Sequence, residues 1–147
     1  MNPQEFIGTW KLSFAEYRFE NGETIAIYGK NPAGMLVYDA HGHVAIQIMR
    51  RDRPRFALND RLGGTPDETK AAFDGYLAYF GTYTVDVTSH SVTHHIEGAL
   101  LPNWVGGDQT RFYDLNDNRL TLRTPPLMIG GRQAVGHLIW ERTHNHL

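Results

Sequence analysis

Short apolar segments alternate with polar turn residues along most of the chain. Ile, Val, Thr, Tyr and Phe cluster in these segments, and Gly, Asn, Asp or Pro separates one segment from the next. Connections such as 21–22 (Asn-Gly) and 116–118 (Asn-Asp-Asn) consist of residue types that tolerate positive φ angles. Because short strands expose sheet edges unless the sheet closes, the pattern favours an antiparallel barrel. The predicted strands are 8–19, 23–28, 34–39, 43–50, 79–86, 91–99, 109–115, 119–124 and 133–142.

One segment departs from the strand pattern and predicts a helix. Thr65 and Glu68 have the spacing of a capping box, and Pro66 occupies the first helical position. We therefore predict one helix over about 66–79 that packs on the barrel. The preceding segment 50–64 contains five Arg together with Pro and Gly-Gly, which is typical of a long loop that lies over a barrel mouth. The apolar residues after the cap have the i, i+3, i+4, i+7 spacing of one helical face: Phe73, Tyr76, Leu77 and Phe80.

Composition narrows the class of protein. A chain of 147 residues accommodates one domain, predicted over 1–147. Fourteen Lys and Arg against sixteen Asp and Glu provide no basic surface for nucleic acid. No apolar run approaches the ~18 residues of a membrane-spanning helix. The absence of cysteine excludes disulfides and thiolate chemistry, and the N-terminal sequence does not have the pattern of a secretory signal, so we expect a cytoplasmic protein.

The two ends of the chain carry a pattern that resembles the lipocalin and calycin barrels. Gly8-Thr9-Trp10 opens the first predicted strand, and Arg142 ends the last one. In those folds the tryptophan plugs the closed end of the barrel and the arginine packs across it. The resemblance therefore implies structural roles for Trp10 and Arg142, in which a guanidinium stacks on an indole face.

Longer stretches across the chain resemble the small lipocalin-like domain family of bacteria and fungi. The resemblance implies an all-β, antiparallel barrel of 8–10 strands with one inserted helix, and a lumen that binds small hydrophobic molecules. Family members associated with biosynthetic gene clusters suggest isomerase-like or cyclase-like roles. The matching stretches are 31–38, 73–83, 93–98, 102–106, 108–113 and 120–126.

Strand alternation predicts which side chains face the lumen. Folding the predicted hairpins about their turns places apolar residues opposite one another on the same face. The lumen is then apolar, with a few polar groups from Tyr83, His94, Arg111 and Tyr113. Such a composition suits a small-molecule site. The predicted cross-strand pairs are Val85–Val92, Tyr83–His94, Leu115–Leu120, Tyr113–Leu122 and Arg111–Thr124.

Three of these polar residues are candidates for catalysis. His94 and Tyr83 could act as acid/base groups, and Arg111 could stabilise the negative charge of an enolate or alkoxide. His94 and Arg111 each have a structural alternative. His94 could be a neutral core histidine bonded to a neighbouring hydroxyl, and Arg111 could form a buried ion pair with Glu97 or Glu16.

Further residues are candidates for ligand binding. Trp104 could be an aromatic group above a ligand at the mouth, or a hydrophobic cap on the barrel rim. The parity of the last strand is open, because either His137 with Ile139 or Leu138 with Trp140 could face inward. The further ligand-binding candidates are Tyr113, Trp104, Tyr38 and His137.

Two functions follow from this lumen. The first is a cofactor-independent enzyme of the isomerase, cyclase or lyase type, which acts on a small, largely apolar substrate. The alternative is a non-catalytic carrier of a small hydrophobic ligand. The chain lacks dinucleotide, P-loop, serine-hydrolase and zinc-protease motifs, so we predict no cofactor and no metal. The predicted partner is a small hydrophobic or amphipathic molecule, and a homodimer is left open.

Overall fold

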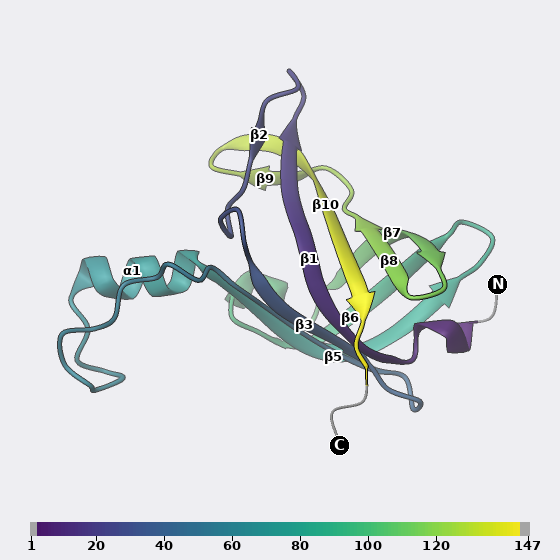
Figure 1. The fold of residues 1–147 in the computed structure, drawn as a ribbon, viewed down its shortest axis with the longest axis horizontal. Coiled ribbons are helices and arrows are strands. Elements are labelled where there is room, and N and C mark those ends of the chain that lie inside the picture. The colour runs from purple at the N-terminus through teal and green to yellow at the C-terminus, as the bar shows by residue number, and fades with distance from the viewer. Residues whose placement is uncertain (1–2, 145–147) are drawn as a thin grey trace.

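The strands follow one another around a closed antiparallel sheet (Figure 1). The computed structural model describes residues 3–144. The barrel order is β1–β3–β4–β5–β6–β7–β8–β10, and β1 pairs again with β10 to close the circle. Short β2 and β9 pair with β1 and β10, respectively. The strands are β1 (Gly8–Phe19), β2 (Thr24–Ile25), β3 (Ala33–Tyr38), β4 (His43–Met49), β5 (Tyr76–Asp86), β6 (Ser91–Ala99), β7 (Asp108–Asn116), β8 (Arg119–Arg123), β9 (Leu127–Ile129) and β10 (Arg132–Arg142).

The strand pairing confirms the predicted hairpins. Val85 pairs with Val92 and Tyr83 with His94 between β5 and β6. The predicted pairs Leu115–Leu120 and Tyr113–Leu122 join β7 to β8. The alternation also fixes the parity of β10, because Leu138 and Trp140 are buried in the core.

A bulge between Phe80 and Gly81 shifts the register of β5 against β6. The two backbones approach so closely at Gly81 that a Cβ atom there would lie 1.9 Å from the carbonyl oxygen of His95. Only glycine fits such an approach without moving a backbone. The extra residue of the bulge is Glu97 on β6, whereas β5 alternates regularly, so Tyr79 and Tyr83 both lie on its inner side.

The inserted helix is shorter than predicted. Helix α1 (Pro66–Asp74) begins with the predicted capping box, in which the Glu68 backbone N–H donates to the Thr65 hydroxyl and the Thr65 backbone N–H donates to the Glu68 carboxylate. Gly75 caps its C-terminus, and the chain enters β5 at Tyr76. The end of the predicted apolar stripe is therefore a strand, because pairing with β4 satisfies its backbone groups in a sheet.

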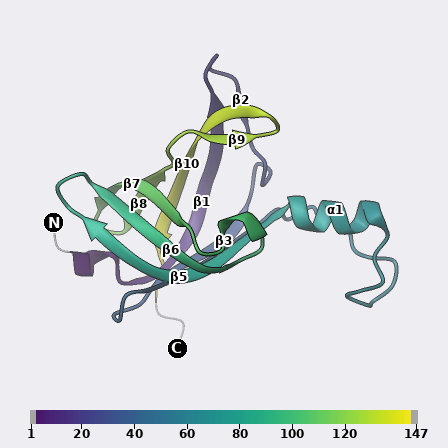
Figure 2. The same cartoon turned by 180° about the vertical axis from the view of Figure 1, so that it is seen from behind.

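The helix also does not pack on the barrel. No residue of α1 is buried, and the helix and the preceding loop project away from the strands (Figures 1 and 2). We call residues 50–75 the arm. It joins the barrel at its base, where the Arg50 backbone N–H donates to the Gly75 carbonyl oxygen. The loop therefore extends outward with the helix and does not cover the mouth.

The end of the barrel near the two termini is closed by an aromatic plug. Trp10 is fully buried, and its indole N–H donates to the Phe6 carbonyl oxygen at 2.9 Å. Phe6 ends a 3-10 helix, η1 (Pro3–Phe6). The Arg142 guanidinium lies 4.2 Å from the centre of the Trp10 ring and donates to the carbonyl oxygens of Ile7 and Glu5. The expected contact between Trp10 and Arg142 is confirmed.

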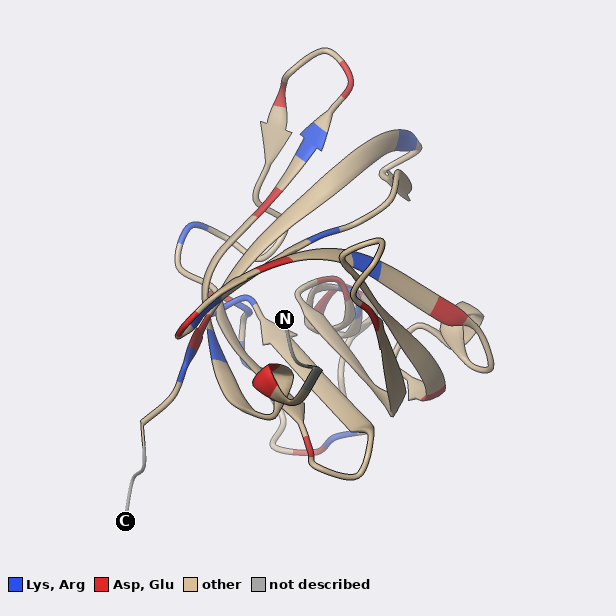
Figure 3. Cartoon of the chain, turned by 90° about the vertical axis from the view of Figure 1, so that its right-hand side faces the viewer, with Lys and Arg blue, Asp and Glu red and all other residues tan. Residues whose placement is uncertain are grey.

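Charged residues of both signs are scattered over strand ends and loops (Figure 3). None of the helices in the described part of the chain is long and apolar enough to cross a membrane.

Candidate ligand-binding site

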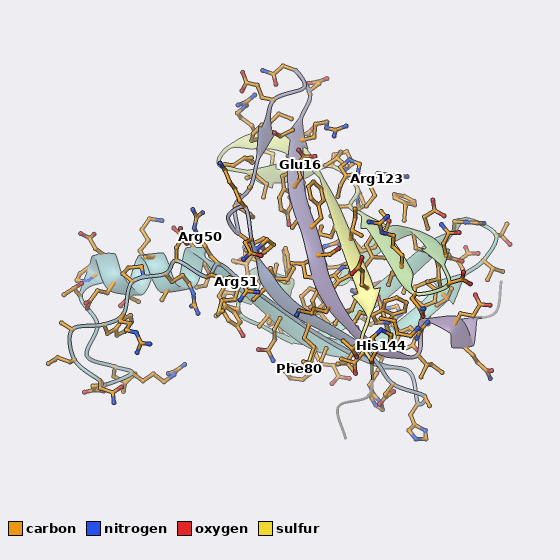
Figure 4. The ribbon with its side chains drawn as sticks, viewed as in Figure 1. Glu16, Arg50, Arg51, Phe80, Arg123 and His144 are labelled. Atoms are coloured by element: carbon orange, nitrogen blue, oxygen red, sulfur yellow. The ribbon has the colours of Figure 1, made fainter. Side chains whose placement is uncertain are left out.

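A cavity of about 910 Å³ occupies the half of the barrel away from the aromatic plug. Its rim includes the segment 25–28, the base of the arm, β9 and a second 3-10 helix, η2 (Pro102–Trp104). Arg50 lies at this base (Figure 4). Most of the lining is apolar, from residues such as Ile46, Ile48, Leu122 and Leu138. The polar or aromatic side chains of the lining include Tyr17, Tyr28, Tyr79, His94, Trp104, Arg111, Thr124 and Trp140.

A second hollow, of about 990 Å³, lies on the outer face of the barrel across β1, β3 and β4. Met35 and Tyr76 contribute to it, and Met35 is 55% exposed. Its floor includes Trp10 of the plug, but the buried arginine and histidine of the lumen do not reach it. The inner cavity is therefore the better candidate for a functional site.

Arg111 brings a buried positive charge into the cavity. Its residue is 8% exposed, and its guanidinium donates to the Thr110 carbonyl oxygen at 2.9 Å and to Gln109 Oε1 at 3.3 Å. No carboxylate of the described residues forms an ion pair with it. The alternative of an ion pair is wrong, because Glu97 is exposed and Glu16 binds Arg18. A buried guanidinium without a counter-charge favours a ligand that accepts hydrogen bonds.

His94 lies fully buried between two tyrosine hydroxyls. Its Nε2 atom lies 2.6 Å from the Tyr38 hydroxyl, and its Nδ1 atom lies 2.6 Å from the Tyr79 hydroxyl. Burial, with repulsion from Arg111, lowers the pKa of His94 to about 3. The imidazole is therefore neutral near pH 7, and both of its nitrogens already have partners. This arrangement matches the structural alternative for His94 and leaves no free nitrogen to act as a base.

The tyrosines around the cavity are also neutral. Burial raises the pKa of Tyr17 and Tyr28, whose ring centroids lie 6.4 Å apart. Burial raises the pKa of Tyr79 to about 12, although Arg111 opposes this shift. The hydroxyls therefore keep their protons at neutral pH and can donate them in hydrogen bonds.

Tyr83 and Tyr113 lie toward the closed end and do not line the cavity. The Tyr83 hydroxyl donates to the Asp39 carbonyl oxygen at 3.0 Å, so it is not the partner of His94. Tyr113 packs edge-on against Phe6, with centroids 4.9 Å apart. Tyr38, which also does not line the cavity, reaches it only through its bond to His94. These placements argue against direct ligand contact for all three tyrosines.

His137 lies on the outer face of β10. Its Cα atom pairs with that of Glu16 on β1 and with that of Arg123 on β8, and both of these side chains lie outside the barrel (Figure 4). The expectation that His137 faces the ligand is wrong, because the inward positions of β10 belong to Leu138 and Trp140.

Trp104 is the aromatic candidate that the structure places at the mouth. It lines the cavity and packs edge-on against Tyr79, with centroids 5.9 Å apart. Three further lining residues, Tyr17, Tyr28 and Tyr79, were not predicted from the sequence. A signal existed for Tyr79, because it shares strand parity with Tyr83, but the helix was predicted to extend to this position.

The chain is similar to known proteins that agree with the barrel fold. Residues 7–143 match the lipocalin-like domain family. The chain is 32% identical over 106 residues to a protein of Aspergillus oryzae (strain ATCC 42149 / RIB 40) named 4'-hydroxy-3'-methoxypropiophenone carrier protein ppsC. The alignment covers 67% of this chain and 96% of that relative. The relative is named a carrier, so the comparison supports the binding alternative and gives no support to catalysis. A match over nearly the whole chain, on a closed antiparallel barrel, shows that this protein belongs to the lipocalin-like domain family.

Proposed function

We propose that the protein binds a small aromatic molecule in the barrel lumen and carries it unchanged. The observation that supports this most directly is Arg111, a buried cation in a largely apolar cavity that has no carboxylate partner among the described residues. Apolar walls provide affinity, and a few polar groups orient the ligand. The name of the Aspergillus relative points to an aryl ketone, whose ring suits Trp104 and whose oxygen substituents suit Arg111.

The bonding of His94 favours a carrier over an enzyme. A general base needs a free nitrogen within reach of the substrate and a pKa near the working pH. His94 has neither, because two tyrosine hydroxyls occupy its nitrogens and its pKa is lowered to about 3. The group instead holds Tyr79 in place at the cavity wall.

The test is a titration of the protein with 4'-hydroxy-3'-methoxypropiophenone, in which quenching of tryptophan fluorescence reports binding. We expect saturable binding, and we expect Arg111→Met to weaken it by about 10- to 100-fold, as the loss of a charged hydrogen bond predicts. Arg123→Met is the matched control, because Arg123 lies outside the barrel against Phe112. Equal affinities of the two variants, or no binding by the parent protein, would refute the proposed site.

The carrier role itself is tested on the recovered ligand. After prolonged incubation with the protein, mass spectrometry and chromatography should return the ligand with its mass and retention time unchanged. Recovery of an isomer or a cyclised product, formed by the parent protein, would overturn the carrier proposal in favour of the enzyme alternative.

A further inference from the structure

The hydrogen bonds around His94 determine where one proton points. A neutral imidazole has one nitrogen that donates and one that accepts. One of its two tyrosine partners must therefore donate to the ring, and the other must accept from it. The accepting tyrosine keeps its own hydroxyl proton free for another partner. The question is whether that free proton belongs to Tyr38 or to Tyr79.

The surroundings of the two hydroxyls decide this. Tyr38 is completely buried, does not line the cavity, and has no hydrogen-bond partner other than His94 within the described residues. A free O–H at Tyr38 would remain buried without an acceptor, which is unfavourable. Tyr38 therefore donates to Nε2, and Nδ1–H donates to Tyr79. The Tyr79 proton is then free at the cavity wall.

Arg111 also brings donors into this cavity. Among residues 3–144, the Arg111 guanidinium has two acceptors for its N–H groups. The lumen thus presents donors from β5 and β7, together with the positive charge of Arg111.

The remaining ionisable groups of the lining do not neutralise this charge. Tyr17 and Tyr28 keep their protons because burial raises their pKa values. At the rim, Asp74 is bound to Lys70 at 2.7 Å, and Arg50 is bound to Asp52. Asp74 is therefore the lining carboxylate, and it already has a partner at the outer end of the cavity.

We propose that the lumen binds an acidic phenol, such as one conjugated to a ketone, as its phenolate, with the oxygen anion between Arg111 and Tyr79. The phenol O–H bond breaks on binding, its electron pair stays on oxygen, and the proton passes to the solvent. This inference rests on the proposed function, because it specifies the charge state of the carried aromatic molecule. A neutral phenol would bring an O–H donor to the donors of Arg111 and Tyr79, whereas a phenolate oxygen only accepts hydrogen bonds.

The phenolate should bind at least tenfold more tightly than the phenol. By linkage, the pKa of the bound phenol then falls by at least one unit below its value in water. The probe is 4'-hydroxy-3'-methoxypropiophenone, whose phenolate absorbs at longer wavelength than its phenol. Just below the pKa of the free probe, addition of the protein should produce the phenolate band. The non-ionisable control is 3',4'-dimethoxypropiophenone, which keeps the ketone and the ring but cannot lose a proton.

The possible outcomes separate this inference from the proposed function. If both probes bind equally and no phenolate band appears, the inference is wrong while the carrier function stands. If neither probe binds, the proposed function fails. If the hydroxyl probe binds with its band shifted and the dimethoxy probe binds at least tenfold more weakly, the inference is supported.

Variants identify the groups responsible. Arg111→Gln should abolish the phenolate band even at saturating probe, and Tyr79→Phe should reduce the shift in pKa. Tyr83→Phe is the matched control for the tyrosine, because its hydroxyl donates to a backbone carbonyl outside the cavity. A phenolate band that survives Arg111→Gln unchanged, in a variant that still melts cooperatively, would overturn the assignment of the anion to Arg111.

Discussion

Two arginines of this barrel have the same chemistry and opposite surroundings. At the closed end, the Arg142 guanidinium covers the Trp10 ring and donates to two backbone carbonyl oxygens at 2.7 Å each. In the lumen, Arg111 has one backbone acceptor and one weak side-chain acceptor, and no carboxylate in the described part of the chain pairs with it. The comparison shows that a guanidinium stabilises the fold where the protein satisfies it and favours a ligand where the protein does not.

The same division extends to the aromatic residues. Around Trp10, the rings of Phe6, Tyr38 and Tyr113 pack edge to face at centroid distances of 4.9 to 5.4 Å. At the mouth, Trp104 is only partly buried and lines the cavity of about 910 Å³. We therefore expect mutations at the closed end to change stability, and mutations at the mouth to change affinity.

Removing the plug should have the largest effect on stability. Trp10→Ala deletes a fully buried ring, its hydrogen bond to the Phe6 carbonyl and its contact with Arg142, so we expect a loss of about 3–5 kcal/mol. Chemical denaturation measures the loss. Trp104→Ala is the matched control at the mouth, where we expect about 1 kcal/mol or less together with weaker binding of the aromatic probe. Similar losses in the two variants would contradict the division between the two ends.

His94 connects the closed end to the cavity, because its ring is bonded to Tyr38 on one side and to Tyr79 on the other. Protonation of His94 should have the next largest effect on the free energy of unfolding. Its pKa is lowered to about 3 in the folded protein, against about 6.5 in an unfolded chain. Between these values the unfolded state binds the proton and the folded state does not. The stability that neutral His94 provides is therefore complete above about pH 6.5 and is lost as the pH falls, by up to about 1.4 kcal/mol per pH unit.

Unfolding free energies at pH 7 and pH 5 measure this loss. We expect His94→Gln to be less stable than the parent at pH 7 and to lose about 2 kcal/mol less over this interval. His137→Gln is the control, because His137 lies on the outer face and its pKa is lowered by a less complete burial. If the unfolding free energies of the parent and of His94→Gln fell equally between pH 7 and pH 5, protonation of His94 would not be the cause of the loss.

The sequence predicted the hairpins well because the two-residue period of a strand is a local property. The pairs across β5 and β6, including Tyr83 with His94, needed only parity and a turn. The helix was overestimated because β5 is apolar on both faces at its start. Tyr76 and Leu77 fit a helical stripe and a two-sided strand equally well, and Gly75 was the stop signal that decided between them.

The site was harder to predict because barrel closure brings its residues together from distant segments. Arg111 and His94 followed from parity. Tyr17 on β1 and Tyr28 in the segment after β2 reach the same cavity, and no local spacing connects them to β6. The strand register also does not determine which group the end of a long side chain contacts. Tyr83 is opposite His94 in the backbone, but its hydroxyl reaches Asp39 instead.

The smallest expected effect distinguishes two tyrosines of the closed half. The Tyr113 hydroxyl is buried without a hydrogen-bond partner among the residues that the structure describes, whereas the Tyr38 hydroxyl is bonded to His94. Removing an unpartnered hydroxyl removes only its desolvation penalty, so Tyr113→Phe should leave stability unchanged or raise it by up to about 1 kcal/mol. The Tyr113 ring keeps its contacts with Phe6 and with His90, which stacks on it at 5.3 Å.

Tyr38→Phe removes the same atom from a bonded tyrosine and is the matched comparison. It leaves Nε2 of His94 buried without a partner, so we expect a loss of about 1–3 kcal/mol. The same variant should also weaken binding of the phenolic probe, because His94 could then turn its proton away from Tyr79. Thermal and chemical unfolding of both variants provide the measurement. Equal destabilisation by Tyr113→Phe and Tyr38→Phe would mean that the hydroxyls contribute only through packing, and the role of Tyr38 in orienting His94 would be rejected.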